Sequence, residues 1–261
     1  MFTSNPFAAL NDVVQPAAVQ TYVVIMMVLV VAGTLFDVVH KRSARYFFDN
    51  WRRSKGKASK QVGGGDLATI VLRTGVVDVL MSGEFCNARR RVAHLLTMYG
   101  FLLYVITTVI MVFGYPTRAT PPPALVPLLW WIGGLMVCLG GYWFWFFIRA
   151  DVSAEGHSTL RIVRADLFVL ALLASVTLGL IWALLQARGD SAANVFLGLY
   201  VIATTVLFGS VPWSKFAHMF FKPAAALEKR LSEANGGRSN LPSPADMPAK
   251  FGSARQRPNH Y

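Results

Sequence analysis

The chain has 261 residues, of which 54% are hydrophobic and 15% charged, and its formal net charge is +12. With a positive mean hydropathy of +0.46, this composition excludes an ordinary water-soluble domain and is typical of a membrane protein. The excess of cations would also suit nucleic-acid binding, but no recognisable nucleic-acid fold accompanies the basic segments. We therefore expect membrane lipid, and no nucleic acid, among its partners.

Five long apolar stretches predict five membrane-spanning helices. The stretches are residues 20–39, 95–115, 124–148, 166–187 and 194–214. Each is long enough for a helix of about 20 residues to cross about 30 Å of hydrocarbon. The first twenty residues contain no lysine or arginine, so the first stretch is expected to be a retained span and not a cleaved signal peptide. The predicted fold class is an all-α integral membrane bundle of five transmembrane helices.

The distribution of positive charge predicts the orientation of these helices. Of the 25 lysines and arginines, 23 lie in residues 38–93, 149–165 and 215–261. Because cytoplasmic loops are enriched in lysine and arginine, we expect the N-terminus outside and the C-terminus in the cytoplasm. The protein is thus expected to be a multi-pass protein of the bacterial cytoplasmic (inner) membrane.

Composition also divides the chain into segments. These are an outer N-terminal segment at 1–19, a five-span membrane domain at 20–225 with a basic cytoplasmic loop at 40–93, and a cytoplasmic polar tail at 226–261. Residues 67–82 have an uneven apolar pattern broken by two charges, which favours a short helix at the membrane interface over a sixth span. The tail is rich in glycine, serine and proline and has little to bury, so we expect it to be mobile.

The third apolar stretch carries aromatic and small residues with different expected roles. Its tryptophans are Trp130, Trp131, Trp143 and Trp145, and its glycines are Gly133, Gly134, Gly140 and Gly141. Tryptophan is enriched at membrane–water interfaces, so these four are interpreted as interfacial belts in contact with lipid. The glycines would either let neighbouring helices approach closely or leave room for a flat cofactor, and close packing is the preferred interpretation.

Two histidines are placed where they could act together. His94 lies just inside the second span, and His218 is expected just before the fifth span leaves the membrane. With the orientation above, both imidazoles would lie at one depth on the cytoplasmic side. Two interpretations remain open: they could be the two axial ligands of a b haem held between facing helices, or ordinary amphipathic side chains at the ends of spans.

The sequences around these histidines resemble a known family. RRRVAHLLTMYGF at 89–101 and WSKFAHMFFKP at 213–223 are similar to the membrane cytochrome b subunits related to the gamma subunit of respiratory nitrate reductase. The similarity is closer to the membrane subunits of heterodisulfide reductase and of quinone-interacting oxidoreductases of sulfur metabolism. The resemblance implies electron transfer between a quinone pool and a cytoplasmic partner through b haem.

Residue by residue, the resemblance implies one haem and not two. The family's two-haem pattern has a further histidine in each of the two ligand helices, and this chain has Tyr104 and Tyr200 there. His94 and His218 would then be the axial ligands of a single b haem, its iron being the only metal implied. Arg90, Arg91 and Lys215 could neutralise haem propionates or bind a quinone carbonyl. These three cations are explained equally by the usual positive flank of a span.

Asp166, at the start of the fourth apolar stretch, also resembles a position of the family. It could pair with Arg164 or relay protons. A helix N-terminal cap accounts for it equally well.

The function implied is that of a membrane anchor and electron-transfer subunit. It would link cytoplasmic iron–sulfur or flavin subunits, possible candidates including adenylylsulfate reductase, to the quinone pool of the electron-transport chain. The alternative is a haem-free structural anchor for such an enzyme, with all redox chemistry in the partner. A transporter is disfavoured, because no pair of matched interrupted spans indicates an inverted repeat.

Overall fold

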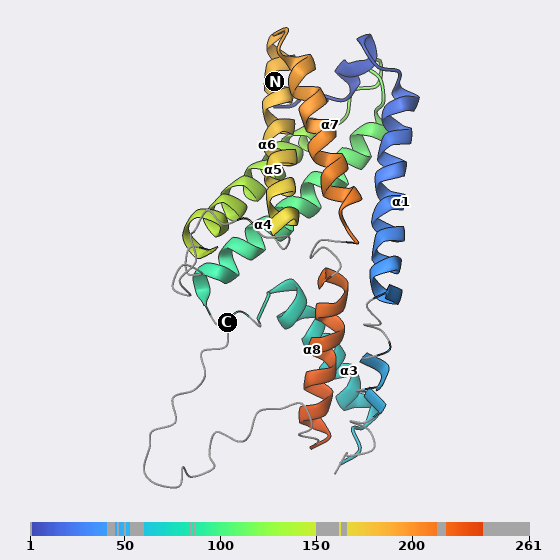
Figure 1. Ribbon diagram of the computed structural model, residues 1–261, viewed down its shortest axis with the longest axis vertical. Helices are drawn as coiled ribbons and strands as arrows, with labels where there is room; N and C mark the ends of the chain where they lie inside the picture. Colours follow the sequence, from blue (N-terminus) through green and yellow to red (C-terminus); the bar gives the residue numbers. More distant parts are fainter. Residues whose placement is uncertain are drawn as a thin grey trace. The chain divides into compact units, whose positions relative to one another are not determined.

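The computed structural model describes residues 2–40, 45, 47–49, 51–52, 60–83, 85, 87–149, 162, 166–212 and 218–236, with the backbone alone at 218–222. Over these ranges the regular structure is entirely helical (Figure 1). The chain divides into two compact units. The first, here called the bundle unit, comprises 1–41 and 87–217, and the second, the loop unit, comprises 42–86 and 218–261.

Five apolar helices make up the bundle unit. They are α1 (Pro16–His40), α4 (Ala88–Val109) continued by the π-helical turn η3 (Ile110–Gly114), α5 (Leu125–Trp143) continued by η4 (Phe144–Ile148), α6 (Leu167–Arg188) and α7 (Ala193–Gly209). Four of the five, all but α7, are long and apolar enough to cross a membrane. The all-helical class is thus confirmed, together with four candidate spans.

The fifth apolar helix is shorter than predicted. α7 has 17 residues and ends at Gly209, whereas the prediction ran to residue 214. Its rise is about 25 Å, less than the roughly 30 Å of a hydrocarbon core. Pro212 supplies a reason for the early end, because the residue before a proline is disfavoured in α-helical geometry. His218 consequently begins a separate helix, α8 (His218–Ala234), and does not lie on the fifth apolar helix.

Local sequence fixes where two of the bundle helices begin and end. The side chain of Asn87 accepts a hydrogen bond of 2.9 Å from the backbone N–H of Arg89 and so caps the start of α4. At the other end of the bundle, Gly189 follows α6 with a left-handed φ of 70°. That conformation favours glycine and lets its N–H bond the carbonyl of Gln186.

Glycines set how closely α4 and α5 pack. A Cβ atom added to Gly133 would lie 2.8 Å from the carbonyl oxygen of Gly100, and one added to Gly140 would lie 2.6 Å from the carbonyl oxygen of Ala93. Both neighbours are backbone atoms of α4, so the two helices touch main chain to main chain. The predicted role of the glycines in close packing is confirmed, as expected for helices that associate in a membrane.

The N-terminal segment packs against the bundle instead of forming only an outer extension. Phe7 and Leu10 are buried, and a 3₁₀ turn, η1 (Ala8–Asp12), precedes α1. The side-chain amide of Asn5 donates hydrogen bonds to the carbonyls of Met111 (3.3 Å) and Tyr115 (2.8 Å). These bonds satisfy carbonyls at the end of η3, where regular helical bonding stops.

Two of the four tryptophans do not form an interfacial belt. Trp130 is 0% exposed and Trp131 8%, so the prediction of lipid contact is wrong for both. The reason is an aromatic cluster in the core of the bundle unit. Phe7 lies between Trp130 (ring centroids 5.9 Å apart) and Trp182 (5.4 Å), and the indole N–H of Trp130 donates to the hydroxyl of Thr108 at 3.0 Å.

The loop unit is held together by an ion pair. It contains α3 (Gly64–Arg73), its π-helical continuation η2 (Thr74–Leu80), and α8 packed against both. Arg230 of α8 donates from Nη2 to Oδ1 of Asp78 at 2.7 Å, and a second bond joins Nε to the other carboxylate oxygen. The predicted helix within 67–82 is confirmed. The first residues of the segment assigned to the polar tail belong to α8, which ends at Ala234, and residues 237–261 lie outside the described part.

Gly133→Ala is expected to lower the free energy of unfolding by about 1–3 kcal/mol, because the added methyl meets backbone that cannot move aside without separating α4 and α5. Gly198→Ala on α7 is the matched control, since nothing lies within 4 Å of its added Cβ. Thermal unfolding in detergent measures both. Equal midpoints for the two variants would contradict the close helix crossing.

Stability of the loop unit should fall in acid. The hydrogen bond from Arg230 is the main cause that lowers the pKa of Asp78 below its ordinary 3.8. A depressed carboxyl pKa contributes stability above the pKa of the unfolded chain, and this contribution is lost as pH falls through the folded pKa. Asp78→Asn should therefore lower the free energy of unfolding by about 1–2 kcal/mol at neutral pH. It should also make this free energy depend less on pH below about pH 4.

A scan of the unfolding midpoint from neutral to acid pH checks this expectation. Asp66→Asn, at an exposed carboxylate of α3, is the control and should follow the wild-type curve. An Asp78→Asn curve parallel to the wild type at all pH values would show that the ion pair contributes nothing.

Candidate functional site

A cavity of about 550 Å³ in the bundle unit is bounded by α1, α4, α6, α7 and the N-terminal segment. Along α1 its lining runs from Ala18 to Val31, a rise of about 20 Å. This is about two thirds of the thickness of a hydrocarbon core. The cavity is thus an elongated space that follows the direction of the helices.

Hydroxyl groups line one part of this otherwise apolar space. The Tyr104 hydroxyl on α4 donates to the Tyr200 hydroxyl on α7 at 3.2 Å. Close by in sequence, the hydroxyls of Ser175 on α6 and Thr204 on α7 are 2.7 Å apart. All four residues line the cavity. Their mutual hydrogen bonds satisfy polar groups that would be costly to leave unpaired in an apolar interior.

The tyrosine pair depends on a glycine of the helix between them. A Cβ atom added to Gly179 of α6 would lie 2.5 Å from the Tyr104 hydroxyl oxygen and 3.0 Å from Cε2 of Tyr200. Each tyrosine ring also stacks on a buried tryptophan, Tyr104 on Trp130 (4.8 Å between centroids) and Tyr200 on Trp182 (5.7 Å). Tyr104 and Tyr200 are the positions at which the two-haem pattern of the cytochrome b family has two further histidines. The structure brings them into direct contact.

A cavity of this kind needs an occupant. Part of its lining is open to the surroundings, since Met27 is 53% and Val31 59% exposed, so molecules of the medium can enter it. Water is a poor filling, because it needs two to four polar partners and the few hydroxyls present mostly bond one another. No residue of the described lining carries a charge. The arrangement favours an elongated apolar molecule.

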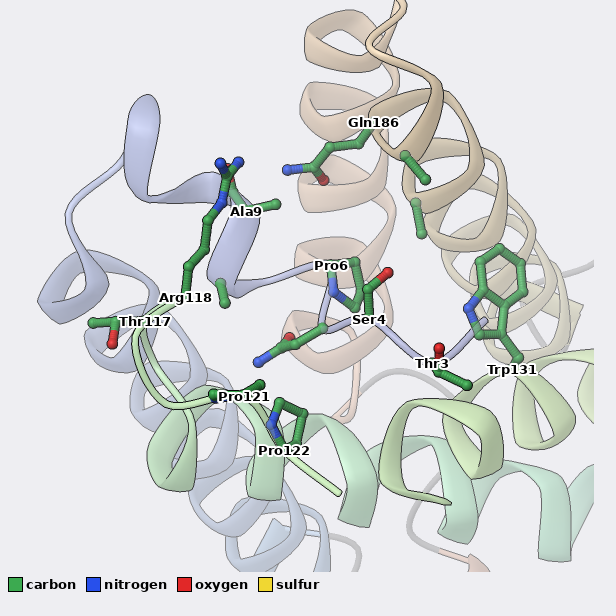
Figure 2. Close-up of a pocket in the computed structure, with 14 residues that line it drawn as sticks. Thr3, Ser4, Pro6, Ala9, Thr117, Arg118, Pro121, Pro122, Trp131 and Gln186 are labelled. Atoms are coloured by element: carbon green, nitrogen blue, oxygen red, sulfur yellow. The ribbon is translucent and has the colours of Figure 1, made fainter. Parts of the chain in front are cut away.

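A second, smaller pocket of about 260 Å³ lies near the start of the chain and the end of α6 (Figure 2). It is more polar, with Arg118 and Gln186 in its lining. Arg118 donates to Asp12 at 2.8 Å, and both side chains are more than half exposed. This cation is therefore already neutralised by a neighbouring carboxylate, which makes the pocket a poor site for a polyanion.

The predicted site residues at the start of α4 are in the bundle unit. Arg90 and Arg91 lie in the first turn and His94 in the second, and all three are partly buried. Their positions near the end of a candidate span are as expected. Nothing in their surroundings tests binding of propionates or of a quinone carbonyl, and this stays a prediction.

The other predicted site residues, Lys215 and His218, are not described together with these three. Lys215 lies outside the described residues, and so does the side chain of His218, whose backbone belongs to the loop unit. The proposed pairing of His94 and His218 on two facing spans is not supported by the helix boundaries, because α7 ends before His218. Axial ligation of a haem by this pair stays untested.

Asp166 has a partner that sequence reasoning did not find. Its carboxylate accepts from Nε of Arg149 at 3.1 Å, with a second bond from the same guanidinium, and both side chains are largely buried. Asp166 begins α6 without a side-chain capping bond, so the cap interpretation is wrong. Arg149 also stacks over the ring of Trp145 at 4.1 Å, which fixes the guanidinium at the end of η4.

Sequence reasoning also missed the hydroxyl residues of the cavity. A signal was present, since Tyr200 and Thr204 are four residues apart in an apolar helix, as are Tyr104 and Thr108. Residues at this spacing share one helix face. Asp37 was missed as well: it is 3% exposed within α1, and a buried carboxylate in a candidate span is a functional candidate.

Comparison with known proteins gives one family. A model of the family described as citrate utilization protein B matches residues 81–239. Citrate utilization protein B of Escherichia coli is 29% identical over 162 residues, which make up 60% of this chain and 41% of the relative. The matched part thus spans well under half of that protein's length. No solved structure matches the chain.

These matches overturn the resemblance to cytochrome b subunits. The family model covers the segments 89–101 and 213–223 that carried the resemblance, and it is a different family. The function derived from the resemblance, a haem-containing or haem-free anchor linking a redox enzyme of sulfur metabolism to quinone, is therefore wrong. Docking of an iron–sulfur or flavin subunit, adenylylsulfate reductase included, stays untested. With more than half of its residues matched by the family model, the chain belongs to the citrate utilization protein B family.

Proposed function

We propose that this protein is a multi-pass membrane component of citrate utilization that holds a lipid chain inside its helical bundle. The observation that carries the proposal is the cavity of about 550 Å³ between α1, α4, α6 and α7, with its uncharged lining. Ligand sites are typically mostly apolar spaces of about 300–1,000 Å³ with a few placed polar groups. The hydroxyls of Tyr104 and Tyr200 are such groups.

The same lining argues against passage of citrate through the bundle. Citrate is a tricarboxylate, and bringing ionised carboxylates into an apolar space without cations is very costly. Within the described part of the bundle unit, Arg149 is paired with Asp166 and Arg118 with Asp12. The link to citrate rests on the family, while the molecule that the cavity accommodates is apolar.

The proposed topology has five spans, with the N-terminus outside and the long basic loop and C-terminal tail in the cytoplasm. The asymmetry of 23 out of 25 lysines and arginines supports it. The short helix α7 would cross by local thinning of the bilayer, at a cost of a fraction of a kcal/mol per ångström of mismatch. The membrane would be the bacterial cytoplasmic membrane.

Filling the cavity should displace its occupant. Ala18 lines the cavity, whereas its neighbour Ala17 does not, and both are exposed positions of α1. We expect Ala18→Phe to lose a lipid that wild type and Ala17→Phe retain, because the phenyl ring takes the space of the chain. Native mass spectrometry after exchange into mild detergent counts the lipids that remain bound.

Val23→Phe, at another lining position of α1, is a second filling variant, for use if Ala18→Phe unfolds. Retention of the lipid by both folded filling variants, or a wild type that retains none, would contradict the proposal.

Proteoliposomes containing the protein should take up no more radiolabelled citrate than protein-free liposomes, because the described lining offers no charge to compensate the three carboxylates. Uptake that depends on the protein would contradict this and would make the bundle a citrate carrier.

A further inference from the structure

The helix formed by α3 and η2 has an apolar stripe that the loop unit does not cover. Ala68, Leu72, Val76 and Leu80 follow one another at intervals of four residues, and all four are exposed, Leu72 by 68%. A spacing of four places side chains on one helix face. No residue of α3 is buried. Singly exposed aliphatic residues are ordinary, whereas an aligned row of them is a candidate contact surface.

The other face of the same helix is already occupied. Thr74, also at an interval of four from Asp78, is 4% exposed, and Asp78 binds Arg230 of α8. On α8, Ala226 and Ser232 are buried. Packing against α8 therefore fixes the rotation of the helix about its own axis and turns the apolar stripe away from the interior of the loop unit.

Charge around the stripe indicates what covers it. The exposed cations among the described residues of the loop unit are Arg45, Arg52, Lys60, Arg73 and Lys229, and the exposed acids are Asp66 and Glu233. This surplus of positive charge complements anionic lipid headgroups, which attract basic segments near a membrane surface. An amphipathic helix with cations on its polar side is the usual form of a segment that lies in the membrane interface.

The chain also keeps this helix near a bilayer. Two candidate spans flank the segment, α1 ending at His40 and α4 beginning at Ala88. The eight residues from Leu80 to Ala88 can reach at most about 28 Å when fully extended. A surface helix tied in this way meets lipid at a high local concentration, whereas a partner protein would have to be recruited.

We propose that the α3–η2 helix lies in the interface of an anionic membrane, with Leu72, Val76 and Leu80 among the acyl chains. The Asp78–Arg230 ion pair holds α8 on its other side and sets this orientation. The proposal concerns the loop unit alone and does not depend on the occupant of the bundle cavity.

Spin labels on the full chain in nanodiscs test it. The discs contain equal parts of phosphatidylcholine and phosphatidylglycerol, and single cysteines are introduced in a Cys86→Ser, Cys138→Ala background at Leu72 and Val76 of the stripe. Asp66→Cys on the polar side of the same helix is the matched control. Collision with oxygen reports contact with lipid, and collision with a water-soluble nickel chelate reports contact with water.

Labels at Leu72→Cys and Val76→Cys are expected to give an oxygen-to-nickel collision ratio several times that of Asp66→Cys. The ratio should fall toward the control in discs of phosphatidylcholine alone. Three other results would overturn the proposal: equal ratios at the three positions, which mean an open aqueous surface; protection from both reagents, which means cover by protein; and a high ratio that is indifferent to anionic lipid.

Discussion

The hydrogen bond between Tyr104 and Tyr200 links the two helical pairs of the bundle unit, which the packing of α5 on α6 also joins. It joins α4 to α7 across α6, at a point where Gly179 leaves room for both rings. α4 packs closely on α5, and α6 on α7, so the bond ties one helical pair to the other. Because each ring also stacks on a buried tryptophan, the two pairs are held at a fixed separation, and the space beside them becomes the cavity.

Small residues and hydroxyl groups hold the helices together because helices surrounded by lipid have few other means of association. Between helices surrounded by lipid, close van der Waals contact and interhelical hydrogen bonds replace the hydrophobic effect as the source of association. The backbone contact of Gly100 with Gly133 is of the first kind, and the Ser175–Thr204 bond is of the second. The cavity lies between α1 and the rest of the bundle, to which Tyr22 of α1 is joined by hydrogen bonds with the carbonyl of Val201 and the hydroxyl of Thr205 on α7.

The loop unit follows different physical rules. Its helices are tied by a charged pair, Asp78 and Arg230, which are far apart in sequence. In water such a pair is stabilising when it is partly shielded, and here the Asp78 side chain is 9% exposed. The same pair separates a face that packs against α8 from an apolar face that does not. One ion pair therefore determines both the packing of this unit and which face of the α3–η2 helix is exposed.

The failure of the cytochrome b interpretation has a physical explanation. Arginines followed by a histidine at the start of a span, or a histidine among aromatic residues after one, satisfy the general requirements of a membrane boundary. Segments of this composition therefore recur at membrane boundaries of proteins that do not share a chemistry. The family match covers both of the segments that carried the resemblance, and helix boundaries that separate α7 from His218 remove the geometric argument for facing ligands.

The sequence by itself determined that the chain is helical and has at least four stretches able to cross a membrane, because hydrophobic length is a local property that needs no partner. It also identified the glycines of α5 and the short amphipathic helix at 67–82. Only the tertiary structure decided that Trp130 is buried and not interfacial, that Asp166 pairs with Arg149, and that Tyr104 meets Tyr200 beside a cavity. Each of these depends on which helices become neighbours, and helix neighbours are chosen by packing over long sequence separations that local pattern does not encode.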